Sequence, residues 1–314
     1  MFGEIKLFTG TAHPELAQEI SDYLQIPLSG ADVFQFPNEN IFVRLHQSVR
    51  GQDVFVIQPM CRPVNKNIME LLIIIDTLKR DSAGRITAVV PYFAYARSDK
   101  KDQPRVPITA RLIADLLETA GADRYLTVDL HAGQIQGFFK IPGDELTAFY
   151  LQRDYLLSKR IPDMVVVAPD VGASKKARNL AEALNAPLAI VEKRRIGNDP
   201  TAQALTLIGD VNDRNVIIFD DEIDTAGTMA GAIRFLKEAG ARDIYAVATH
   251  AILSDPATER LRNVPLTELI ITNTVHIPPE KYLPNMTVLS VAPLLGEVIR
   301  RIHFGISVGA LFNE

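Results

Sequence analysis

One stretch in the second half of the chain constrains the fold more than any other. Residues 216–219 are four apolar residues in a row, which is typical of a parallel strand that is buried on both faces. Acidic residues follow at 220, 221, 222 and 224, then Thr-Ala-Gly-Thr at 225–228 and an amphipathic run over 229–239. The order of strand, loop and helix start predicts an α/β fold with this loop at the carboxyl edge of a sheet.

The loop has the chemistry of an anion site. Small residues before a helix let its free N–H groups approach a phosphate, which the helix dipole also attracts. Asp220 and Asp221 at the strand end can take ribose hydroxyls or Mg²⁺. The alternative is that Asp224 or Thr225 only caps a helix. We favour the anion site, and the pattern resembles the ribose-phosphate loop of the phosphoribosyltransferase-type fold.

Length and charge narrow the class of protein. A chain of 314 residues predicts two domains. With 33 Lys and Arg against 38 Asp and Glu, the net charge of −5 argues against a nucleic-acid partner. A single cysteine, Cys61, excludes an internal disulfide and a zinc cluster of cysteines. The N-terminus lacks the apolar core of a signal peptide, and the apolar runs are too short to span a membrane. We therefore expect a cytoplasmic protein without a membrane partner.

Strands alternate with helices along the chain, which predicts parallel sheets. In the first half we expect strands at 5–8, 41–45, 53–58, 86–91 and 125–129, and helices at 14–24, 67–80 and 108–120. In the second half we expect strands at 164–168, 188–191, 216–220, 244–249 and 268–272, and helices at 173–184, 229–239 and near 257–261.

The two halves also contain similar short sequences. DVFVI at 53–57 parallels NVIIF at 215–219, and RITAV at 85–89 parallels DIYAV at 243–247. Composition alone can produce such strings, but the matched order of elements favours a duplicated α/β domain. We expect domains at 1–148 and 149–289, with a C-terminal arm at 290–314 that packs on the first domain.

Three further clusters follow predicted strands. Residues 92–101 mix aromatic and cationic side chains, which suits a base and a polyphosphate, although a solvated basic loop is the plain alternative. Asp129 and His131 face one side if the chain is extended there, which suits a metal or phosphate contact; for either residue alone, a hydrogen-bonded structural role is the default interpretation. The basic triplet 193–195 follows the strand at 188–191 and precedes a segment, 196–200, that looks mobile; it is either a solvated surface or part of the ligand edge.

Common nucleotide and hydrolase motifs are absent from the sequence. It contains no G-x-x-x-x-G-K-[ST], G-x-G-x-x-G, G-x-S-x-G or H-E-x-x-H pattern. Phosphate handling must therefore depend on the loops described above.

Taken together, these motifs make the chain resemble the ribose-phosphate diphosphokinase, or phosphoribosyl pyrophosphate synthetase, family from near Ile5 to Phe312. The motifs that carry the resemblance are PYFAYAR at 91–97, DLHAGQIQGFF at 129–139, Pro169-Asp170, KRR at 193–195 and DDEIDTAGT at 220–228. The resemblance implies two duplicated phosphoribosyltransferase-type domains, each with a mainly parallel sheet flanked by helices. It also implies transfer of the diphosphoryl group of ATP to the 1-hydroxyl of ribose 5-phosphate, giving phosphoribosyl pyrophosphate (PRPP) and AMP.

The resemblance assigns roles to residues of this chain. The residues implied to bind ribose 5-phosphate are Asp220, Asp221, Asp224, Thr225, Ala226, Gly227 and Thr228. Those implied to bind ATP are Phe36, Asn38, Asn40, Arg97, Ser98 and His131. The implied ligands of Mg²⁺, directly or through water, are Asp129, His131, Asp170, Asp220 and Asp221, and the implied catalytic residues are Lys193, Arg195 and His131. Such a transfer needs positioning and charge stabilisation rather than a covalent nucleophile.

The chain departs from the family pattern on the nucleotide side. Acidic positions of the family are Asn38 and Asn40 here, a glutamine is Ser98, and an acidic residue associated with metal is Lys140, although Asp144 remains. These changes concern nucleotide choice more than the reaction. The candidate regulatory residues that match the family are Ser48, Arg50, Ser82 and Ser307. The family also implies a homohexamer built from dimers.

Two other functions use part of this pattern. A phosphoribosyltransferase needs the loop at 224–228 but neither a duplicated domain nor the motifs at 129–131 and 193–195. A non-catalytic regulatory homologue of the same family is the second alternative; retention of Lys193, Arg195, His131 and Asp220 favours an enzyme.

Overall fold

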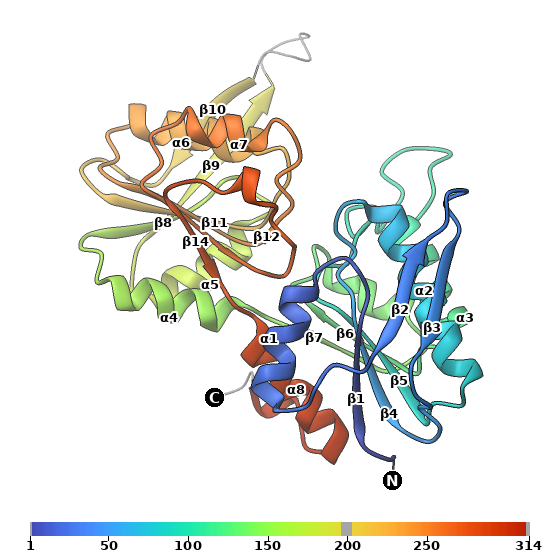
Figure 1. Ribbon diagram of the computed structural model, residues 1–314. Coiled ribbons are helices and arrows are strands. Elements are labelled where there is room, and N and C mark those ends of the chain that lie inside the picture. The colour runs from blue at the N-terminus through green and yellow to red at the C-terminus, as the bar shows by residue number, and fades with distance from the viewer. Residues whose placement is uncertain (1, 196–202, 312–314) are drawn as a thin grey trace. The chain divides into compact units, whose positions relative to one another are not determined.

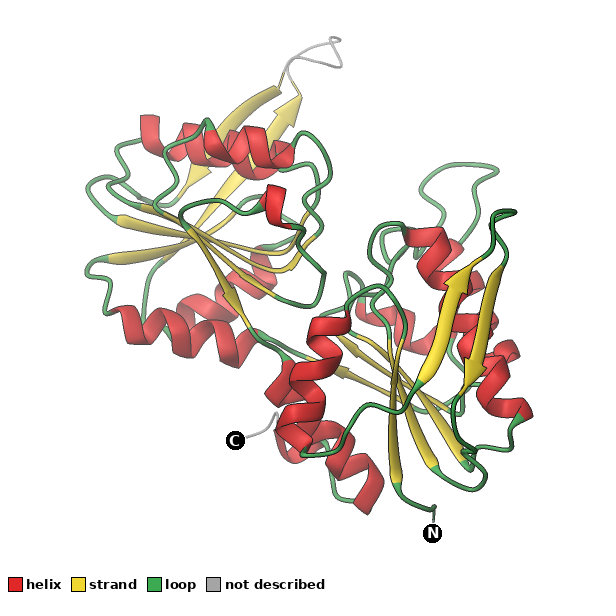
Figure 2. Cartoon of the chain, in the orientation of Figure 1, coloured by secondary structure: helices red, strands yellow, loops and turns green. Residues whose placement is uncertain are grey.

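The computed structural model describes residues 2–195 and 203–311, and the chain forms two compact units. Unit 1 contains the residues up to 147, residues 274–276 and those from 290 onward. Unit 2 contains residues 148–273 and 277–289. Figure 1 labels the elements along the chain, and Figure 2 colours them by type.

Unit 1 is built on a five-stranded sheet in the order β1-β4-β5-β6-β7, whose neighbouring strands pair in parallel. The strands are β1 (Ile5–Thr9), β4 (Asp53–Ile57), β5 (Arg85–Val90), β6 (Arg124–Val128) and β7 (Gly143–Leu146). The residues of β4 are buried throughout, as expected for a central parallel strand covered on both faces.

Helices cover the sheet of unit 1, and a separate ribbon lies beside α2. The helices are α1 (Pro14–Leu24), α2 (Val64–Arg80), α3 (Thr109–Ala120) and α8 (Ala292–Phe304), with short 3₁₀ turns η1 (Gly133–Phe138) and η3 (Gly309–Leu311). The ribbon pairs β2 (Ala31–Gln35) with β3 (Ile41–Leu45) in antiparallel register. The core joins α2 and α3 to one face of the sheet through side chains such as Val54, Leu71 and Leu117.

A buried ion pair fixes the C-terminal helix α8 within unit 1. Arg85 donates to Asp53 Oδ2 at 2.6 Å and to the carbonyl oxygen of Ile302 at 3.1 Å. His303 Nδ1 lies 2.8 Å from the same carboxylate. Because Asp53 is fully buried, loss of both Arg85 and His303 would leave an uncompensated charge in the core. This network explains why the end of the chain belongs with its beginning.

Unit 2 is built on a seven-stranded sheet in the order β10-β9-β8-β11-β12-β13-β14. The strands are β8 (Met164–Ala168), β9 (Leu188–Arg195), β10 (Gln203–Ile208), β11 (Asn215–Ile223), β12 (Ile244–Ala251), β13 (Glu268–Thr272) and β14 (Met286–Leu289). The β9–β10 pair is antiparallel and the other neighbouring pairs are parallel. The helices are α4 (Phe149–Lys159), α5 (Ser174–Ala183), α6 (Gly227–Glu238) and α7 (Ala257–Arg262), with a 3₁₀ turn η2 (Pro279–Lys281).

Alternation along β11 divides the core of unit 2 into two layers. Val216 and Ile218 pack with α6 and α7, whereas Ile217 and Phe219 pack with α4 and α5. A strand that is buried on both faces has a continuous run of apolar residues in its sequence, as β11 does at 216–219. The polar end of β11 therefore emerges between two helical layers (Figure 1).

The two sheets share one topology, which confirms the predicted duplication. The order β1-β4-β5-β6-β7 corresponds strand by strand to β8-β11-β12-β13-β14. The crossover helix α2 between β4 and β5 corresponds to α6 between β11 and β12. The β2–β3 ribbon and the β9–β10 hairpin each lie between the first and second of these matched strands in the chain.

Several predicted boundaries were wrong. β9 continues to Arg195 and β11 to Ile223, because each keeps a ladder partner beyond its apolar residues. The strand expected to end at Asp129 ends at Val128, and α6 begins at Gly227 rather than 229. Elements that the sequence analysis did not predict are β2, β7, β10, β14, α4 and α8. Among the described residues, no helix combines the length and the apolar character needed to cross a membrane.

Candidate active site

The acidic residues after the apolar run lie inside β11, not in a loop. Asp220 is opposite Ala248 and Glu222 is opposite His250 in the ladder with β12. Only residues 224–226 remain as the connection to α6. The carboxylates at 220–222 are therefore held by a strand, which positions a side chain more exactly than a loop does.

Three aspartates gather at the carboxyl edge of two adjacent strands, β8 and β11. Asp170 follows β8 and accepts a hydrogen bond from Ala173 N at 3.0 Å, while Asp220 Oδ1 accepts from Asp221 N at 2.9 Å. Burial raises the pKa of Asp220 to about 8, and the neighbouring Asp221 and Asp170 add to the effect. Neighbouring carboxylates repel one another because their charges have the same sign, and their oxygens are the ligands that Mg²⁺ prefers.

Lys176 pairs with this acidic group. Its ammonium lies 3.4 Å from Asp221 Oδ2 and comes from the first turn of α5. Asp221 follows Ile217 and Phe219 in the strand alternation, so it reaches the layer that contains α5. Sequence analysis missed this residue, although a lysine one turn after Pro169-Asp170 was a usable signal.

The connection from β11 to α6 presents a helix N-terminus. Ala226 has a left-handed backbone with φ of 56°, and α6 begins at Gly227 and runs for 12 residues. The carbonyl oxygen of Thr225 accepts a hydrogen bond from Arg260 Nη1 at 2.9 Å, which holds the connection to α7. Gly227 is exposed, and the N–H groups in the first turn of a helix suit a phosphate. Arg260 was not predicted, and nothing in its local sequence points to it.

A cavity of about 400 Å³ lies beside this helix start within unit 2. Thr228 lines it together with Gly227 and Gly231 from α6, Pro169 after β8, and residues of the β9–β10 hairpin. The cavity brings the loop predicted to bind ribose phosphate next to the strand that was predicted to precede the basic triplet.

The basic triplet lies in β9 rather than after it, so the predicted position was wrong. Lys193 is opposite Leu205 and Arg195 is opposite Gln203 in the antiparallel ladder. The side chains of 193–195 and the segment 196–202 lie outside the described residues, and this segment includes the whole stretch 196–200 that was expected to be mobile.

In unit 1, the loop after β5 carries Arg97, whose side chain is exposed. Ser98 is engaged locally: its hydroxyl accepts a hydrogen bond from Thr109 N and contacts Thr109 Oγ1, both at 3.3 Å. The serine therefore fastens the loop to the start of α3. Tyr95 has a left-handed backbone with φ of 61°, and its hydroxyl donates to Asn65 Oδ1 at 2.6 Å.

The loop after β6 lies next to the Arg97 loop, because β5 and β6 are neighbours. Asp129 has φ of 41°, so the chain is not extended there, and the condition on which Asp129 and His131 were expected to share a face is not met. The imidazole of His131 is exposed. Gln134 donates to Asp99, which connects the two loops at one sheet edge.

Lys140 and Asp144, two positions of interest near this edge, are both engaged with nearby charges. Lys140 Nζ lies 3.6 Å from Asp115 and 4.0 Å from Glu118 on α3. Asp144 on β7 accepts from Arg124 Nε at 3.1 Å. Both side chains therefore serve ion pairs at the sheet in this structure.

The turn at 36–40 belongs to the β2–β3 ribbon, not to the five-stranded sheet. Phe36 is 44% exposed and stacks edge-on with Phe34 and Phe42, with ring centroids 5.1 and 5.9 Å away. Asn38 Oδ1 accepts from Asn40 N at 3.2 Å. The structure thus places Phe36, Asn38 and Asn40 together but on a different sheet from Arg97 and His131.

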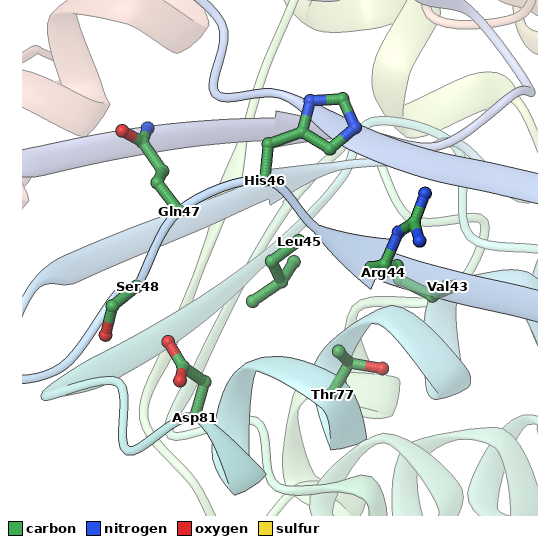
Figure 3. A pocket seen from close by; sticks show the side chains of 8 residues that line it. All are labelled: Val43, Arg44, Leu45, His46, Gln47, Ser48, Thr77 and Asp81. Carbon is green, nitrogen blue, oxygen red and sulfur yellow. The ribbon is translucent and has the colours of Figure 1, made fainter.

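The candidate regulatory residues lie partly together in unit 1. Arg50 bridges to Ala83, the neighbour of Ser82, and Arg50 N lies 3.4 Å from Ser48 Oγ. Ser307 follows α8, and its carbonyl oxygen accepts from Arg301 at 2.8 Å. Figure 3 shows the adjacent cavity of about 450 Å³, with Ser48 and Asp81 at one end and Leu45 turned toward α2.

Comparison with known proteins gives consistent results for both ends of the chain. Residues 5–121 match the N-terminal domain of ribose phosphate pyrophosphokinase, and residues 196–313 match the phosphoribosyl synthetase-associated domain. The ribose-phosphate pyrophosphokinase of Wolinella succinogenes is 51% identical over 307 residues, covering 98% of each chain. That of Clostridium perfringens is 49% identical and covers 99% of this chain and 98% of its own. The crystal structure of phosphoribosylpyrophosphate synthetase from Mycobacterium smegmatis has a TM-score of 0.92 at 46% identity, covering 96% of this chain and all of that one.

Proposed function

Because the chain belongs to the ribose-phosphate pyrophosphokinase family, we propose that it transfers the diphosphoryl group of ATP to ribose 5-phosphate, giving PRPP and AMP for nucleotide biosynthesis. The observation that carries the proposal is the acidic edge of β8 and β11 beside the N-terminus of α6. A sugar phosphate needs both features: carboxylates for its hydroxyls and backbone N–H groups for its phosphate.

On the acceptor side, residues 224–228 bind the 5-phosphate. The donors are backbone N–H groups at the start of α6 and the hydroxyls of Thr225 and Thr228. Asp220 and Asp221 bind the ribose hydroxyls. Lys176 and Arg260 are positioning residues, because one pairs with Asp221 and the other holds the carbonyl of Thr225.

The acidic group fits Mg²⁺. Its carboxylate oxygens are hard ligands, and the raised pKa of Asp220 shows how strongly the site disfavours uncompensated negative charge. Asp220, Asp221 and Asp170 would hold one ion, and Asp129 with His131 in unit 1 would contact the other. When bound, the metal neutralises charge on the diphosphate.

The reaction forms one bond and breaks another at the β-phosphorus of ATP. The 1-hydroxyl oxygen of ribose 5-phosphate attacks that phosphorus and loses its proton, while the bridging oxygen leaves with the α-phosphate as AMP. Lys193, Arg195 and His131 stabilise the charge on the transferred group. Positively charged groups that strengthen their contacts in the transition state are sufficient for this class of transfer.

On the nucleotide side, Arg97 and His131 contact the phosphates. Phe36 stacks on the base, and Asn38 and Asn40 of the same turn lie beside the base. The exposure of Phe36 supports this role, since an aromatic ring left in water is available to a planar ligand. Ser98 contributes by holding the loop to α3.

The same proposal includes assembly and regulation. A homohexamer built from dimers would supply the ribbon turn of one subunit to a neighbour, and Ser48, Arg50, Ser82 and Ser307 would take part in a regulatory anion site. A cytoplasmic place of action, expected from the sequence, is part of the proposal as well.

The direct test is to incubate the pure protein with ribose 5-phosphate, Mg²⁺ and ATP and to measure AMP and PRPP in equal amounts. Omission of ribose 5-phosphate is the control, because it separates transfer from ATP hydrolysis. Absence of AMP with ATP and with every other nucleoside triphosphate would reject the enzyme and leave the non-catalytic homologue.

A further inference from the structure

A second cluster of ligand-type side chains lies in unit 1, away from the residues assigned above. It consists of His13, Glu15 and His276, which each offer one ligand atom, and these atoms lie within 4.8 Å of one another. His13 precedes α1 and Glu15 is in its first turn, whereas His276 belongs to the segment 274–276 that joins unit 1. The chain thus brings together residues about 260 positions apart.

Two of the three distances between ligand atoms are close to those in a tetrahedral metal centre. Glu15 Oε2 lies 3.2 Å from His13 Nδ1 and 3.6 Å from His276 Nδ1. Bonds of about 2.0–2.1 Å in a tetrahedron place neighbouring ligand atoms roughly 3.4 Å apart. The two measured edges lie on either side of this value.

The hydrogen bonding at His13 leaves a role for a cation. Its Nδ1 lies 3.4 Å from Leu16 N, which is long for a hydrogen bond, and it also faces the carboxylate of Glu15. Nδ1 of His13 cannot accept from Leu16 N and donate to Glu15 Oε2 at the same time, because a ring nitrogen either carries a proton or accepts one. A cation between the three atoms serves both edges at once, and the contact that it would weaken at Leu16 is already a long one.

The surroundings define a partly open site. The side chain of His13 is 7% exposed, whereas those of His276 and Glu15 are 38% and 62% exposed. A buried ligand fixes the centre, and the exposed side leaves room for water. Glu15 stays ionised, because a hydrogen bond from its own backbone N–H, followed by His13 and His276, holds its pKa below the ordinary value.

We propose that His13, Glu15 and His276 form a binding site for a divalent transition metal of the Zn²⁺ class, distinct from the Mg²⁺ sites of the reaction. Two imidazoles and one carboxylate are a known zinc ligand set with one position open to water. Mg²⁺ prefers oxygen ligands only, so this site discriminates against it. A bound ion fastens the segment 274–276 to the start of α1.

The test is Zn²⁺ binding by metal-free full-length protein in excess Mg²⁺, measured against a competing chelator. His276→Gln removes an exposed ligand, and His13→Asn removes the buried one while keeping a side chain that caps a helix. We expect each substitution to weaken the binding of one Zn²⁺ per chain at least ~tenfold, since even outer-shell changes cost ~10–100-fold. His46→Gln is the matched control, because His46 also pairs with a carboxylate, Asp32 at 2.7 Å, on the surface of unit 1.

X-ray absorption of the zinc-loaded protein is the second readout. The proposal predicts two imidazole ligands in the wild type and one in His276→Gln. Equal Zn²⁺ affinity in the wild type and His276→Gln, or an equal loss in His46→Gln, would overturn the proposal.

Discussion

The β4–α2 connection of unit 1 and the β11–α6 connection of unit 2 occupy equivalent places in a duplicated fold, but their chemistry differs. In β11 the apolar run ends at Asp220. The equivalent position after β4 is Gln58, whose amide is fully buried, accepts from Ala12 N at 3.1 Å and donates to Glu70 at 2.8 Å. At the end of β11 neighbouring carboxylates repel one another, whereas at the end of β4 the amide of Gln58 has hydrogen-bond partners for both its oxygen and its nitrogen.

The helix starts differ in residue type, although both are exposed. α6 begins after Ala226 with exposed Gly227, whereas α2 begins after Pro63, and both Pro63 and Asn65 are exposed. Glycine leaves the backbone of α6 open to close approach by a ligand, whereas Val64 and Asn65 place side chains at the start of α2. We therefore assign the acceptor to the second unit.

Replacing the polar side chain at each of the two matched positions tests this comparison most strongly. We expect Asp220→Asn to lower kcat/KM at least ~10³-fold, because it removes a group that acts on the charge of the reacting complex. Gln58→Leu should instead lower the free energy of unfolding by ~2–4 kcal/mol, since it leaves Glu70 buried with fewer partners. Steady-state kinetics and urea unfolding measure both effects.

The activity of Gln58→Leu per folded molecule should stay close to wild type. A large loss of turnover in fully folded Gln58→Leu would contradict the division of roles between the two strand ends.

The β9–β10 hairpin has no counterpart in the five-stranded sheet, and Lys193 tests its role. We expect Lys193→Ala to lower kcat ~10²-fold with little change in KM, because its contact should strengthen in the transition state. Arg194→Ala, at the adjacent position of β9, is the control. A change confined to KM would assign Lys193 to ground-state binding.

The strain at Asp220 predicts a gain in stability when its charge is removed. The folded pKa of about 8 exceeds the ordinary value of 3.8, so the folded protein holds a proton that the unfolded chain releases. Without Mg²⁺, stability should therefore fall as the pH rises from about 4 to 8. Asp220→Asn should be more stable by ~1–2 kcal/mol at pH 8, and the gain should vanish near pH 4. Equal stability of both proteins across this range would show that the carboxylate is not strained.

The nucleotide side should show the smallest effect. If Asn38 and Asn40 relax base selection, GTP and CTP should support turnover within ~tenfold of ATP, since a single pocket contact discriminates only modestly. The double variant Asn38→Asp, Asn40→Glu should restore a preference for ATP. Strict use of ATP by the wild type would reject this interpretation.

The sequence was sufficient for the features that depend on burial. The apolar runs of β4, β8 and β13 predicted central strands, because buried strands contain almost only apolar residues. For the same reason the matched strands of the two halves have similar sequences, which predicted the duplication. The strands β2 and β7 were missed, since one is a partly exposed ribbon and the other, Gly143–Leu146, has little apolar pattern.

The sequence predicted some residues of the candidate site and missed others. The acidic run and the small residues before α6 predict an acceptor edge, which stays a prediction, and their strand boundary depended on pairing with β12, which no local pattern shows. The left-handed backbone of Asp129 and the hydrogen bond from Thr109 to Ser98 are likewise set by tertiary contacts. Lys176 reaches Asp221 only through the stacking of α5 on the sheet.

The measurement that tests the central claim most directly is amide hydrogen exchange with and without ribose 5-phosphate and Mg²⁺. The account predicts slower exchange at the start of α6, in peptides that cover 224–230, and unchanged exchange in peptides that cover 58–66 before and within α2. Protection of 58–66, with none at 224–230, would contradict the assignment of the acceptor to the second unit.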